Sequence, residues 1–399
     1  MSSAYRKLLI CVIALSFPLG ASATTYSAIV LGQGNTNNGQ NALQVVGLGA
    51  SDGFAYLPVW QDASGTWYQT GILPGQGTKF SALVTGRASG TGLGKLQVIG
   101  LGANDGLAYV AAYQDLNGNW YAGGALPQSG TTYKQLVAAT GSCSSHPLQV
   151  VGLGAADGIP YLVAFQDTNG NWSASAQALG TTAFSSISVG YGNGGNLQLF
   201  GVRASDGLPL LSAFQNNTNG ACAWQNAGSI PAPSATATKL IQVNGNHGNL
   251  QVLGIRASDA HAYLPYWQDS DGNWNAGGPI PDGGYALTAL AGAQGNSSYL
   301  QLWGLGTDGT PRMIAWQNGS GTWGGVGTAP IYLAGLTSIA MGNGNNNNVQ
   351  VIGLGVNNHI ILASFQDSGS GTWYAGNDLT PSSGVGGGGG GNGCHPICP

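Results

Sequence analysis

The stretch LQVVGLGASDGFAYLPVWQDASGTW, residues 43–67, returns almost unchanged as LQVIGLGANDGLAYVAAYQDLNGNW at 96–120. The chain holds seven such units, each opening with an apolar residue before Gln, at Leu43, Leu96, Leu148, Leu197, Leu250, Leu300 and Val349. Each unit runs to a closing Trp, at Trp67, Trp120, Trp172, Trp224, Trp274, Trp323 and Trp373. A spacing of about 50 residues is typical of repeat architectures, in which a unit buries its faces only by packing on its neighbours.

Each unit contains four apolar segments separated by turn residues. In the second unit these are FSALV (80–84), LQVIGLG (96–102), AYVAAYQ (108–114) and the residues around the closing Trp. Runs of β-forming residues bounded by Gly, Asn and Asp predict short strands joined by tight turns. Seven units of four strands predict an all-β fold, a seven-bladed β-propeller with four antiparallel strands per blade. Whether strands from the two ends of the chain share a blade is left open.

The turn between the second and third segments gives a predicted register. If these strands pair through Asp52 and Gly53, Gly49 lies opposite Tyr56 and Val45 lies opposite Trp60. Rings over strand glycines are a known packing device, so most aromatic side chains are expected to fill the space between blades. The Gln that ends each third segment is expected to satisfy buried backbone groups.

The chain is poor in charge. Only 6% of its 399 residues are charged, it contains no Glu, and its formal net charge is −4 at pH 7. This composition offers no basic surface, so neither nucleic acid nor anionic lipid is an expected partner. The His residues stand one at a time, and DSDG at 269–272 lacks the later ligands of a calcium loop, so no metal or other cofactor is predicted.

The N-terminus has the form of a secretory signal peptide. Arg6 and Lys7 precede an apolar run that is too short to span a membrane, and ASA at 21–23 predicts cleavage after Ala23. We therefore expect a signal peptide at 1–23 and a secreted protein, extracellular or periplasmic, without membrane insertion. A propeller domain is expected at 24–380 and a flexible Gly-rich tail, ending in a Cys pair, at 381–399.

Four cysteines follow the signal peptide. They allow three pairings in an oxidising compartment. Cys143 and Cys222 fall in loops that adjacent blades place on the same rim, which favours a bridge between them, and Cys394 would then pair with Cys398. The other pairings stay open, because the distance between the two loops is unknown from the sequence.

Copies of the pattern LQVIGLGxxDGxxYLxxWQDxxGxW resemble the seven-bladed fucose-binding lectins of the Photorhabdus lectin type, over about residues 25–380. The resemblance implies a bacterial lectin with several sugar sites per subunit, in clefts between blades lined by aromatic and polar side chains. It implies fucose or O-methylated sugars, on fucosylated or O-methylated cell-surface glycans, as ligands and no catalysis. A homo-oligomer is one alternative that the sequence leaves open.

Sugar-binding candidates follow from the chemistry of a pyranose, whose apolar C–H face stacks on aromatic rings while its hydroxyls need fixed polar partners. Units one, two, three and five carry a Tyr at one third-strand position, where the other units carry Leu210, Arg312 and Ile361. The turn Asp or Asn is the expected hydrogen-bond partner. Arg256 could donate to sugar oxygens or plug a gap opposite Tyr263. The predicted carbohydrate-binding residues are Tyr56, Trp60, Trp67, Tyr109, Trp120, Tyr161, Trp172, Tyr263, Trp267, Trp274 and Arg256.

Two other functions remain as alternatives. A structural or protein-binding propeller would use all of these aromatic side chains as core. A sialidase-like glycoside hydrolase would need an arginine cluster and unshared carboxylates, and 11 of the 14 Asp belong to the repeat, which leaves Asp271, Asp282 and Asp378. The sequence therefore favours a secreted, multivalent, non-enzymatic lectin.

Overall fold

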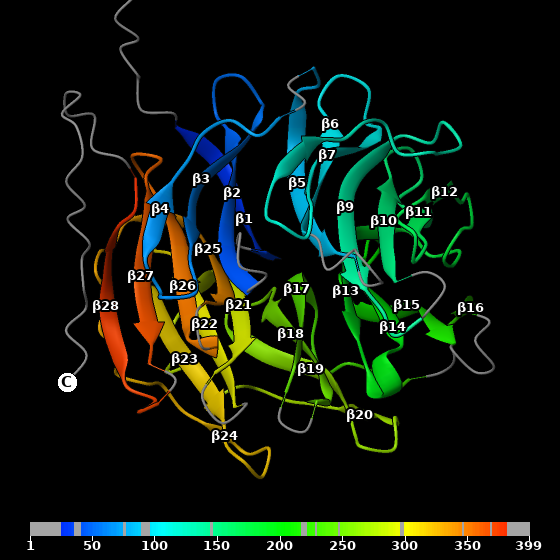
Figure 1. Ribbon diagram of the computed structural model, residues 1–399. Coiled ribbons are helices and arrows are strands. Elements are labelled where there is room, and N and C mark those ends of the chain that lie inside the picture. Colours follow the sequence, from blue (N-terminus) through cyan, green and yellow to red (C-terminus); the bar gives the residue numbers. More distant parts are fainter. Residues whose placement is uncertain are drawn as a thin grey trace, which may run out of the picture.

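The computed structural model confirms the seven-bladed β-propeller, in which each blade is a sheet of four antiparallel strands (Figure 1). It describes residues 25–35, 41–74, 77–88, 96–143, 147–216, 222–227, 230–245, 248–295, 299–344, 347–367 and 369–380. The predicted signal peptide and the predicted tail lie outside the described residues. Each blade is built from four consecutive strands, so blade 1 is β1 to β4 and blade 7 is β25 to β28.

The first strand of each blade contacts the first strands of both neighbouring blades, all the way round, and therefore lies nearest the centre. These first strands are β1 (Tyr26–Asn35), β5 (Phe80–Arg87), β9 (Tyr133–Thr140), β13 (Phe184–Tyr191), β17 (Ala237–Asn244), β21 (Leu287–Gln294) and β25 (Leu336–Asn343). The second strands, which carry the LQV segments, are β2 (Asn41–Gly49), β6 (Leu96–Gly102), β10 (Leu148–Gly154), β14 (Leu197–Arg203), β18 (Leu250–Arg256), β22 (Leu300–Gly306) and β26 (Val349–Gly355).

The two outer strands of each blade run up to the closing Trp and beyond it. The third strands are β3 (Ala55–Gln61), β7 (Ala108–Gln114), β11 (Pro160–Gln166), β15 (Pro209–Asn216), β19 (Ala262–Gln268), β23 (Pro311–Gln317) and β27 (Ile360–Gln366). The fourth strands are β4 (Trp67–Gln69), β8 (Trp120–Ala122), β12 (Trp172–Ala174), β16 (Ala223–Asn226), β20 (Trp274–Ala276), β24 (Trp323–Gly324) and β28 (Trp373–Asp378). A single 3-10 turn, Asn193–Gly195, is the only helical element among the described residues.

The register within a blade differs from the predicted one. Tyr56 pairs with Gly47 instead of Gly49, and Trp60 pairs with Gln44 instead of Val45. The turn holds four residues, 50–53, closed by a hydrogen bond from the Gly49 amide to the Phe54 carbonyl, so its centre lies one residue earlier than assumed. A β-bulge then places two residues of β3, Leu57 and Pro58, opposite Val46 of β2 and shifts the rest of the ladder by one residue.

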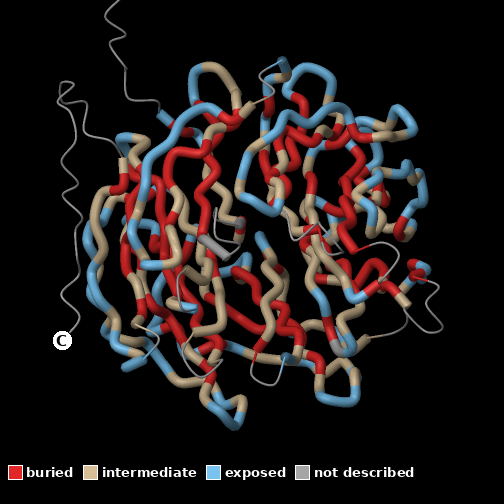
Figure 2. Tube along the Cα trace, viewed as in Figure 1, coloured by how far each residue is buried: buried red, intermediate tan, exposed pale blue. Residues whose placement is uncertain are grey.

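The core lies between blades and not at the centre of the ring (Figure 2). We call the packed interface between two neighbouring blades a seam and name it by its blades. Each of the seven seams contains its own cluster of buried apolar side chains from both blades. Because both faces of every sheet are buried in this way, a single unit has no stable state of its own, which accounts for the repetition.

Buried Gln side chains make polar contacts between neighbouring blades. Gln44 donates to Gln114 across seam 1/2, at 3.2 Å, and Gln97 donates to Gln166 across seam 2/3, at 2.8 Å. The Gln that ends a third strand also donates to a loop carbonyl of its own blade, as Gln61 does to Gly65 at 3.0 Å. The expectation that these side chains satisfy buried backbone groups is confirmed.

The ring closes by side-chain contacts between blades 7 and 1. Gln350 donates to Gln61 at 2.8 Å, and Gln33 donates to the backbone carbonyl of Asn343 at 3.2 Å. No strand is exchanged between the two ends of the described chain, because every sheet takes its strands in sequence order from one unit.

A disulfide joins blades 3 and 4. Cys143 and Cys222 are bonded, with their Cα atoms 5.6 Å apart, as predicted. The Ser142 amide beside it donates to the Gly195 carbonyl at 3.0 Å, so the bridge and a backbone contact hold seam 3/4 at the same point. The predicted pair of Cys394 and Cys398 lies outside the described residues. Within the described residues, no helix has the length and apolar character that crossing a membrane requires.

Candidate functional site

The predicted Tyr residues of blades 1 to 3 lie at the turn between the second and third strands. Tyr56 donates to Asp52 at 2.5 Å, and Tyr109 and Tyr161 bond Asp105 and Asp157 in the same way, at 2.5 and 2.6 Å. The hydrogen bond from Tyr109 holds the pKa of Asp105 below its usual range. In these three blades the turn Asp, predicted to be the hydrogen-bond partner of a sugar, accepts a hydrogen bond from the Tyr of its own unit. Since each hydroxyl already has a strong acceptor, the pair braces the turn.

A glycine at the end of the second strand makes room for this contact. A Cβ at Gly102 would come within 3.0 Å of the Tyr109 ring and would also overlap the Asp105 carboxylate. Blades 4 and 5 carry Arg203 and Arg256 at this position, and there the arginine itself pairs with the turn Asp. The same turn is thus held by Tyr in three blades and by Arg in others.

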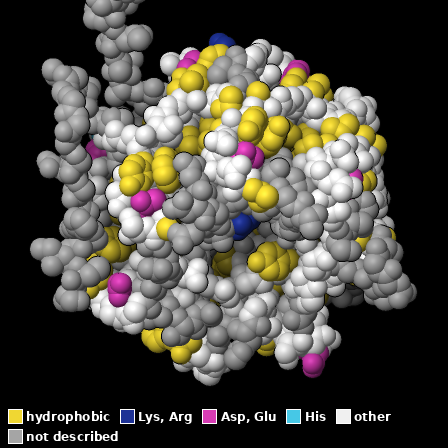
Figure 3. Space-filling model, viewed as in Figure 1, with side chains coloured by type: hydrophobic (Ala, Val, Ile, Leu, Met, Phe, Trp, Pro, Cys, Tyr) yellow, Lys and Arg dark blue, Asp and Glu magenta, His cyan; other side chains and the backbone are white. Residues whose placement is uncertain are grey.

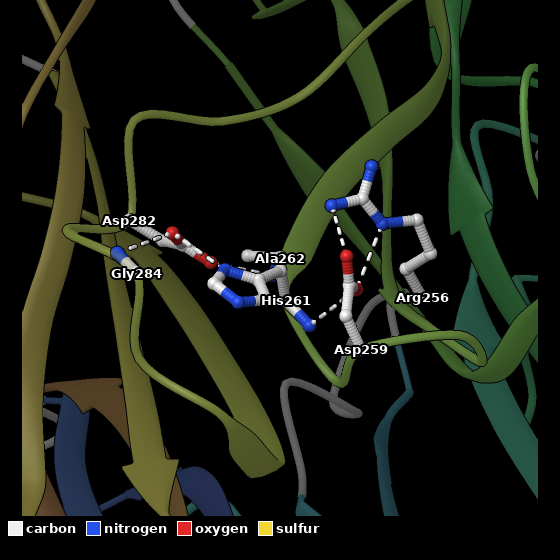
Figure 4. A network of polar contacts seen from close by, with 6 residues as sticks. All are labelled: Arg256, Asp259, His261, Ala262, Asp282 and Gly284. Carbon is white, nitrogen blue, oxygen red and sulfur yellow. Dashed lines mark hydrogen bonds and ion pairs between the residues drawn. The ribbon is translucent and has the colours of Figure 1, made fainter.

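Arg256 is therefore occupied within its own blade. Its guanidinium bonds Asp259 at 2.8 Å and 2.5 Å, as Figure 4 shows, and it does not plug a gap opposite Tyr263, which pairs with Gly254. This hydrogen bond from Arg256 also holds the pKa of Asp259 below its usual range.

Tyr263 departs from the other three predicted tyrosines. Its side chain is only 1% exposed, and its hydroxyl donates to the Ala235 carbonyl at 3.0 Å instead of to the turn Asp. The first strand of blade 5 begins with Ala237 where blades 1 to 4 have an aromatic ring over the second-strand glycine, and the Tyr263 ring fills that space, within 2.8 Å of a Cβ built on Gly254. The expectation that Tyr263 faces a sugar is wrong for this conformation, since burial seals the ring from solvent.

The Tyr and the closing Trp of one unit, both predicted to bind carbohydrate, lie at opposite ends of the third strand. Tyr56 stands near the start of β3, whereas Trp67 pairs with Gln61 at its end. Five residues of strand span about 16 Å. One monosaccharide cannot contact both side chains, so the two residues would belong to different sites.

The predicted Trp residues meet across seams, between units instead of within them. In six of the seven seams, an aromatic residue of the third strand of one blade and the closing Trp of the next belong to the same apolar cluster. Trp60 and Trp120 meet in seam 1/2, Trp172 lies in seam 2/3, Trp274 in seam 4/5, Trp267 in seam 5/6 and Trp67 in seam 7/1. Trp274 packs on Phe200, with ring centroids 4.9 Å apart, and Tyr266 contacts both rings.

Seam 6/7 opens into a cleft of about 350 Å³. Blade 6 contributes Trp316, with Met313 beside it, and blade 7 contributes Trp373. Three neighbouring residues of the segment after β24, 327–329, line one side of it. Its complete lining is Gln301, Met313, Trp316, Gly327, Thr328, Ala329, Gln366, Gly371, Thr372 and Trp373.

The Trp316 ring lacks the cover that Trp60 has at the same position of blade 1. Tyr68 follows the closing Trp of blade 1 and stacks on Trp60, with centroids 4.8 Å apart and planes 21° from parallel. The residue that follows the closing Trp of blade 6 is Gly324, and a Cβ there would lie 2.6 Å from the Trp316 ring. An indole with glycine beneath it and a cleft beside it can receive a flat apolar ligand face.

Two of the residues that line the cleft of seam 6/7 each have a buried polar atom with no hydrogen-bond partner among the described residues. These atoms are Nε1 of Trp373 and Oε1 of Gln301. At the matching positions of seam 3/4, Trp224 Nε1 donates to Gln149 Oε1 at 2.6 Å. The Oε1 atom at the position of Gln301 is also unpaired in other units, at Gln44, Gln198, Gln251 and Gln350. The particular feature of seam 6/7 is that this acceptor and an unpaired indole donor lie beside an open cleft, and this combination indicates a place for ligand groups.

The sequence interpretation missed this cleft because it ranked blades by the turn Tyr, which blades 6 and 7 lack. The signals that could have found it were Gly324 in place of an aromatic or polar residue and the distance of 23 residues from Leu300 to Trp323, which is one shorter than the 24 residues in five other units. Seam 6/7 contains a third indole beside Trp316 and Trp373. This is Trp303 of β22, which packs on Trp373 with ring centroids 5.0 Å apart.

Two of the three carboxylates outside the repeat, Asp282 and Asp378, lie in different blades. Asp282 of blade 5 is buried and accepts from the Ala262 amide at 2.8 Å and the Gly284 amide at 3.0 Å, with His261 beside it (Figure 4). Asp378 lies two blades away and contacts His359 at 2.8 Å. Both brace chain segments of their own blades. Among the described residues, no group of three or more His, Cys, Asp or Glu is placed to hold a metal.

Comparison with known proteins gives neither a matching family model nor a matching curated relative. Among solved structures, a fungal lectin from Aleuria aurantia, described as a six-bladed β-propeller with a novel fucose recognition mode, is 16% identical, with 76% of this chain and 96% of that chain covered and a TM-score of 0.46. The SapL1 lectin in complex with α-methyl fucoside is 14% identical over 75% of this chain and 96% of that one, with a TM-score of 0.47. A puromycin hydrolase is 12% identical, and the match covers 90% of this chain but 55% of that chain, with a TM-score of 0.53. At these identities the likeness to the hydrolase, the one of these three with a TM-score above 0.5, shows a β-propeller fold and nothing about activity.

Proposed function

We propose that the protein is a carbohydrate-binding protein, a lectin, which binds glycans in clefts between its blades. The observation that carries the proposal is the cleft of seam 6/7, where an indole face without a stacked ring lies beside an unpaired buried donor and an unpaired buried acceptor. Sugar sites need this combination, because a pyranose has an apolar face and a rim of groups that donate and accept hydrogen bonds.

The charge distribution supports a neutral ligand. The residues that line the cleft include no Asp, Lys, Arg or His, and on the face drawn in Figure 3 the described charged side chains stand singly among uncharged ones. Nucleic acid and anionic lipid need clustered cations, which the composition does not supply.

Fucose and O-methylated sugars are the first ligands to test, since the resemblance of the repeats implies them. A deoxy or O-methyl group has apolar neighbours here in Met313 and Ala329. Secretion through the predicted signal peptide, with cleavage after Ala23, belongs to the same proposal. Binding without catalysis and engagement of several glycans at once complete it, because weak sites in one ring gain avidity on a glycan surface.

A glycan array probed with the full chain tests the proposal. We expect binding that free sugar competes away and that Trp316→Ala abolishes at seam 6/7, because the stacking surface is lost. Trp267→Ala is the matched control, since it removes the same third-strand indole from seam 5/6. An array without sugar-competable signal, for a protein that is folded by circular dichroism, would exclude the lectin.

A further inference from the structure

We propose that the cleft of seam 6/7 selects sugars that carry an acetamido group, the N-acetylhexosamines. This inference rests on the proposed function and adds the ligand class for one site. It starts from two atoms, Trp373 Nε1 and Gln301 Oε1, which come from opposite walls of the seam and have no partner among the described residues.

The donor and the acceptor together define the ligand group. Trp373 Nε1 can only donate, so it needs an oxygen, and Gln301 Oε1 can only accept, so it needs an N–H or O–H. In seam 3/4 the matching atoms bond each other directly at 2.6 Å, whereas in seam 6/7 they do not. A secondary amide carries a carbonyl oxygen and an N–H on opposite sides. It can therefore accept from Trp373 Nε1 and donate to Gln301 Oε1 when these two atoms lie apart, whereas a hydroxyl would have to bond both through a single oxygen.

The cleft also offers a place for the methyl group of an acetamide. Met313 and Ala329 line it, and both belong to the apolar cluster of seam 6/7. Met313 packs on Gly327, where a Cβ would come 2.6 Å from its sulfur. A thioether adapts to small apolar groups, so the methyl gains contacts that a bare hydroxyl does not.

Charge excludes the related sugars. No ionisable side chain is among the residues that line the cleft, so a free amino sugar would bury an ammonium group and a sugar acid would bury a carboxylate without a counter-charge. The acetamido group is neutral, and an N-acetylated sugar has the same pyranose ring as the corresponding amino sugar. The cleft therefore distinguishes an N-acetylated sugar from its amine and from its hydroxyl analogue.

Seam 1/2 supplies an internal control. Gln44 Oε1 and Trp120 Nε1 are also without partners among the described residues, but the third-strand ring of that seam, Trp60, is covered by Tyr68. Seam 1/2 thus shares the two unpaired atoms and lacks the open ring. Trp373→Phe and Trp120→Phe each remove one unpaired indole N–H and keep an aromatic ring.

Calorimetric titration of the full chain tests the inference with two pairs of methyl β-glycosides, N-acetylglucosamine against glucose and N-acetylgalactosamine against galactose. We expect the acetamido member of at least one pair to bind about tenfold more tightly, the worth of one well-placed hydrogen bond. Trp373→Phe is expected to remove this difference, while Trp120→Phe keeps it. Titration of Trp316→Ala assigns the binding to the cleft.

The outcomes separate the two proposals. Equal affinities within both pairs, for a protein that binds some other sugar in a way that needs Trp316, would overturn the acetamido inference and leave the lectin intact. A difference that survives in Trp373→Phe would also overturn it, because the selecting group would then lie elsewhere. Absence of binding to every sugar on the array and in the titrations would overturn the proposed function itself.

Discussion

Seam 3/4 and seam 6/7 are built from equivalent positions of the same repeat, but seam 3/4 is closed by bonds between its blades and seam 6/7 contains a cleft. Seam 3/4 carries the disulfide, and its closing Trp224 donates to Gln149 at 2.6 Å. In seam 6/7 the corresponding Trp373 and Gln301 atoms stay unpaired beside a cleft of about 350 Å³. The difference teaches that one motif can serve stability at one place in a ring and ligand binding at another, since the ring as a whole supplies the stability that an open seam lacks.

The disulfide should give the largest effect. Replacing both cysteines, Cys143→Ser with Cys222→Ser, releases a crosslink between residues 79 apart and is expected to lower the free energy of unfolding by about 4 kcal/mol, because the unfolded chain regains the entropy of that loop. Urea unfolding of the double variant beside the wild type measures it. Superimposable curves would show that seam 3/4 holds without the bridge, and sugar binding at seam 6/7 should not change in either case.

The closing Trp residues give the next effect. Trp224→Phe removes the donor to Gln149 and is expected to cost about 1–3 kcal/mol of unfolding free energy. Trp373→Phe removes a donor that bonds no described residue and loses only part of the packing on Trp303. We therefore expect it to cost less than Trp224→Phe, by about 1 kcal/mol, the worth of one hydrogen bond. Thermal or urea unfolding compares the two variants. Equal losses of unfolding free energy in the two variants would contradict the distinction between the closed seam 3/4 and the open seam 6/7.

Gly324→Tyr would carry the cover of blade 1 into blade 6. A Cβ at Gly324 lies 2.6 Å from Trp316, so the indole must shift, and the new ring can lie over it as Tyr68 lies over Trp60. We expect sugar binding at seam 6/7 to weaken by about tenfold with stability nearly unchanged. Tyr68→Gly, the reverse exchange, is the matched control and should leave this binding intact. Wild-type affinity in Gly324→Tyr would show that the open face of Trp316 is not used.

The smallest effect concerns the turn between the second and third strands of blade 3, which is part of neither the disulfide nor the cleft of seam 6/7. The hydrogen bond from Tyr161 lowers the pKa of Asp157, so the ionised carboxylate stabilises the folded state above the unfolded pKa of about 3.9, and this contribution is lost as the pH falls through the folded pKa. Tyr161→Phe should therefore be slightly less stable than the wild type near neutral pH, and the two should converge well below pH 4. Unfolding curves at several pH values measure the difference. A gap that persists unchanged in acid would exclude this origin, and unchanged sugar binding would confirm that the turn is structural.

The fold followed from the sequence because seven copies of one pattern leave few other ways to bury both faces of each sheet. The register did not, since a four-residue turn moves the partner of Tyr56 from Gly49 to Gly47 and a β-bulge in β3 then shifts the later pairs by one residue. The burial of Tyr263 depends on Ala237, a residue far away in the unit that leaves the space its ring takes.

The open cleft was harder to predict than any single blade. It depends on what covers Trp316, which is decided by the residue after the closing Trp, and on which polar atoms find partners across a seam. Neither property belongs to one unit, so a comparison of units position by position does not reveal it. The Trp residues predicted to bind carbohydrate pack between blades in five other seams, and their contact with sugar stays a prediction.

The building of each blade from four consecutive strands affects how such a gene can change. A unit can be duplicated or deleted in frame without dividing any sheet, and the ring then has only to rejoin where blade 7 meets blade 1, through contacts such as Gln350 with Gln61. Circularly permuted chains cut at other blade boundaries should reassemble for the same reason. The number of blades can thus change in evolution by whole units, while the residues of each seam can diverge independently of the other seams.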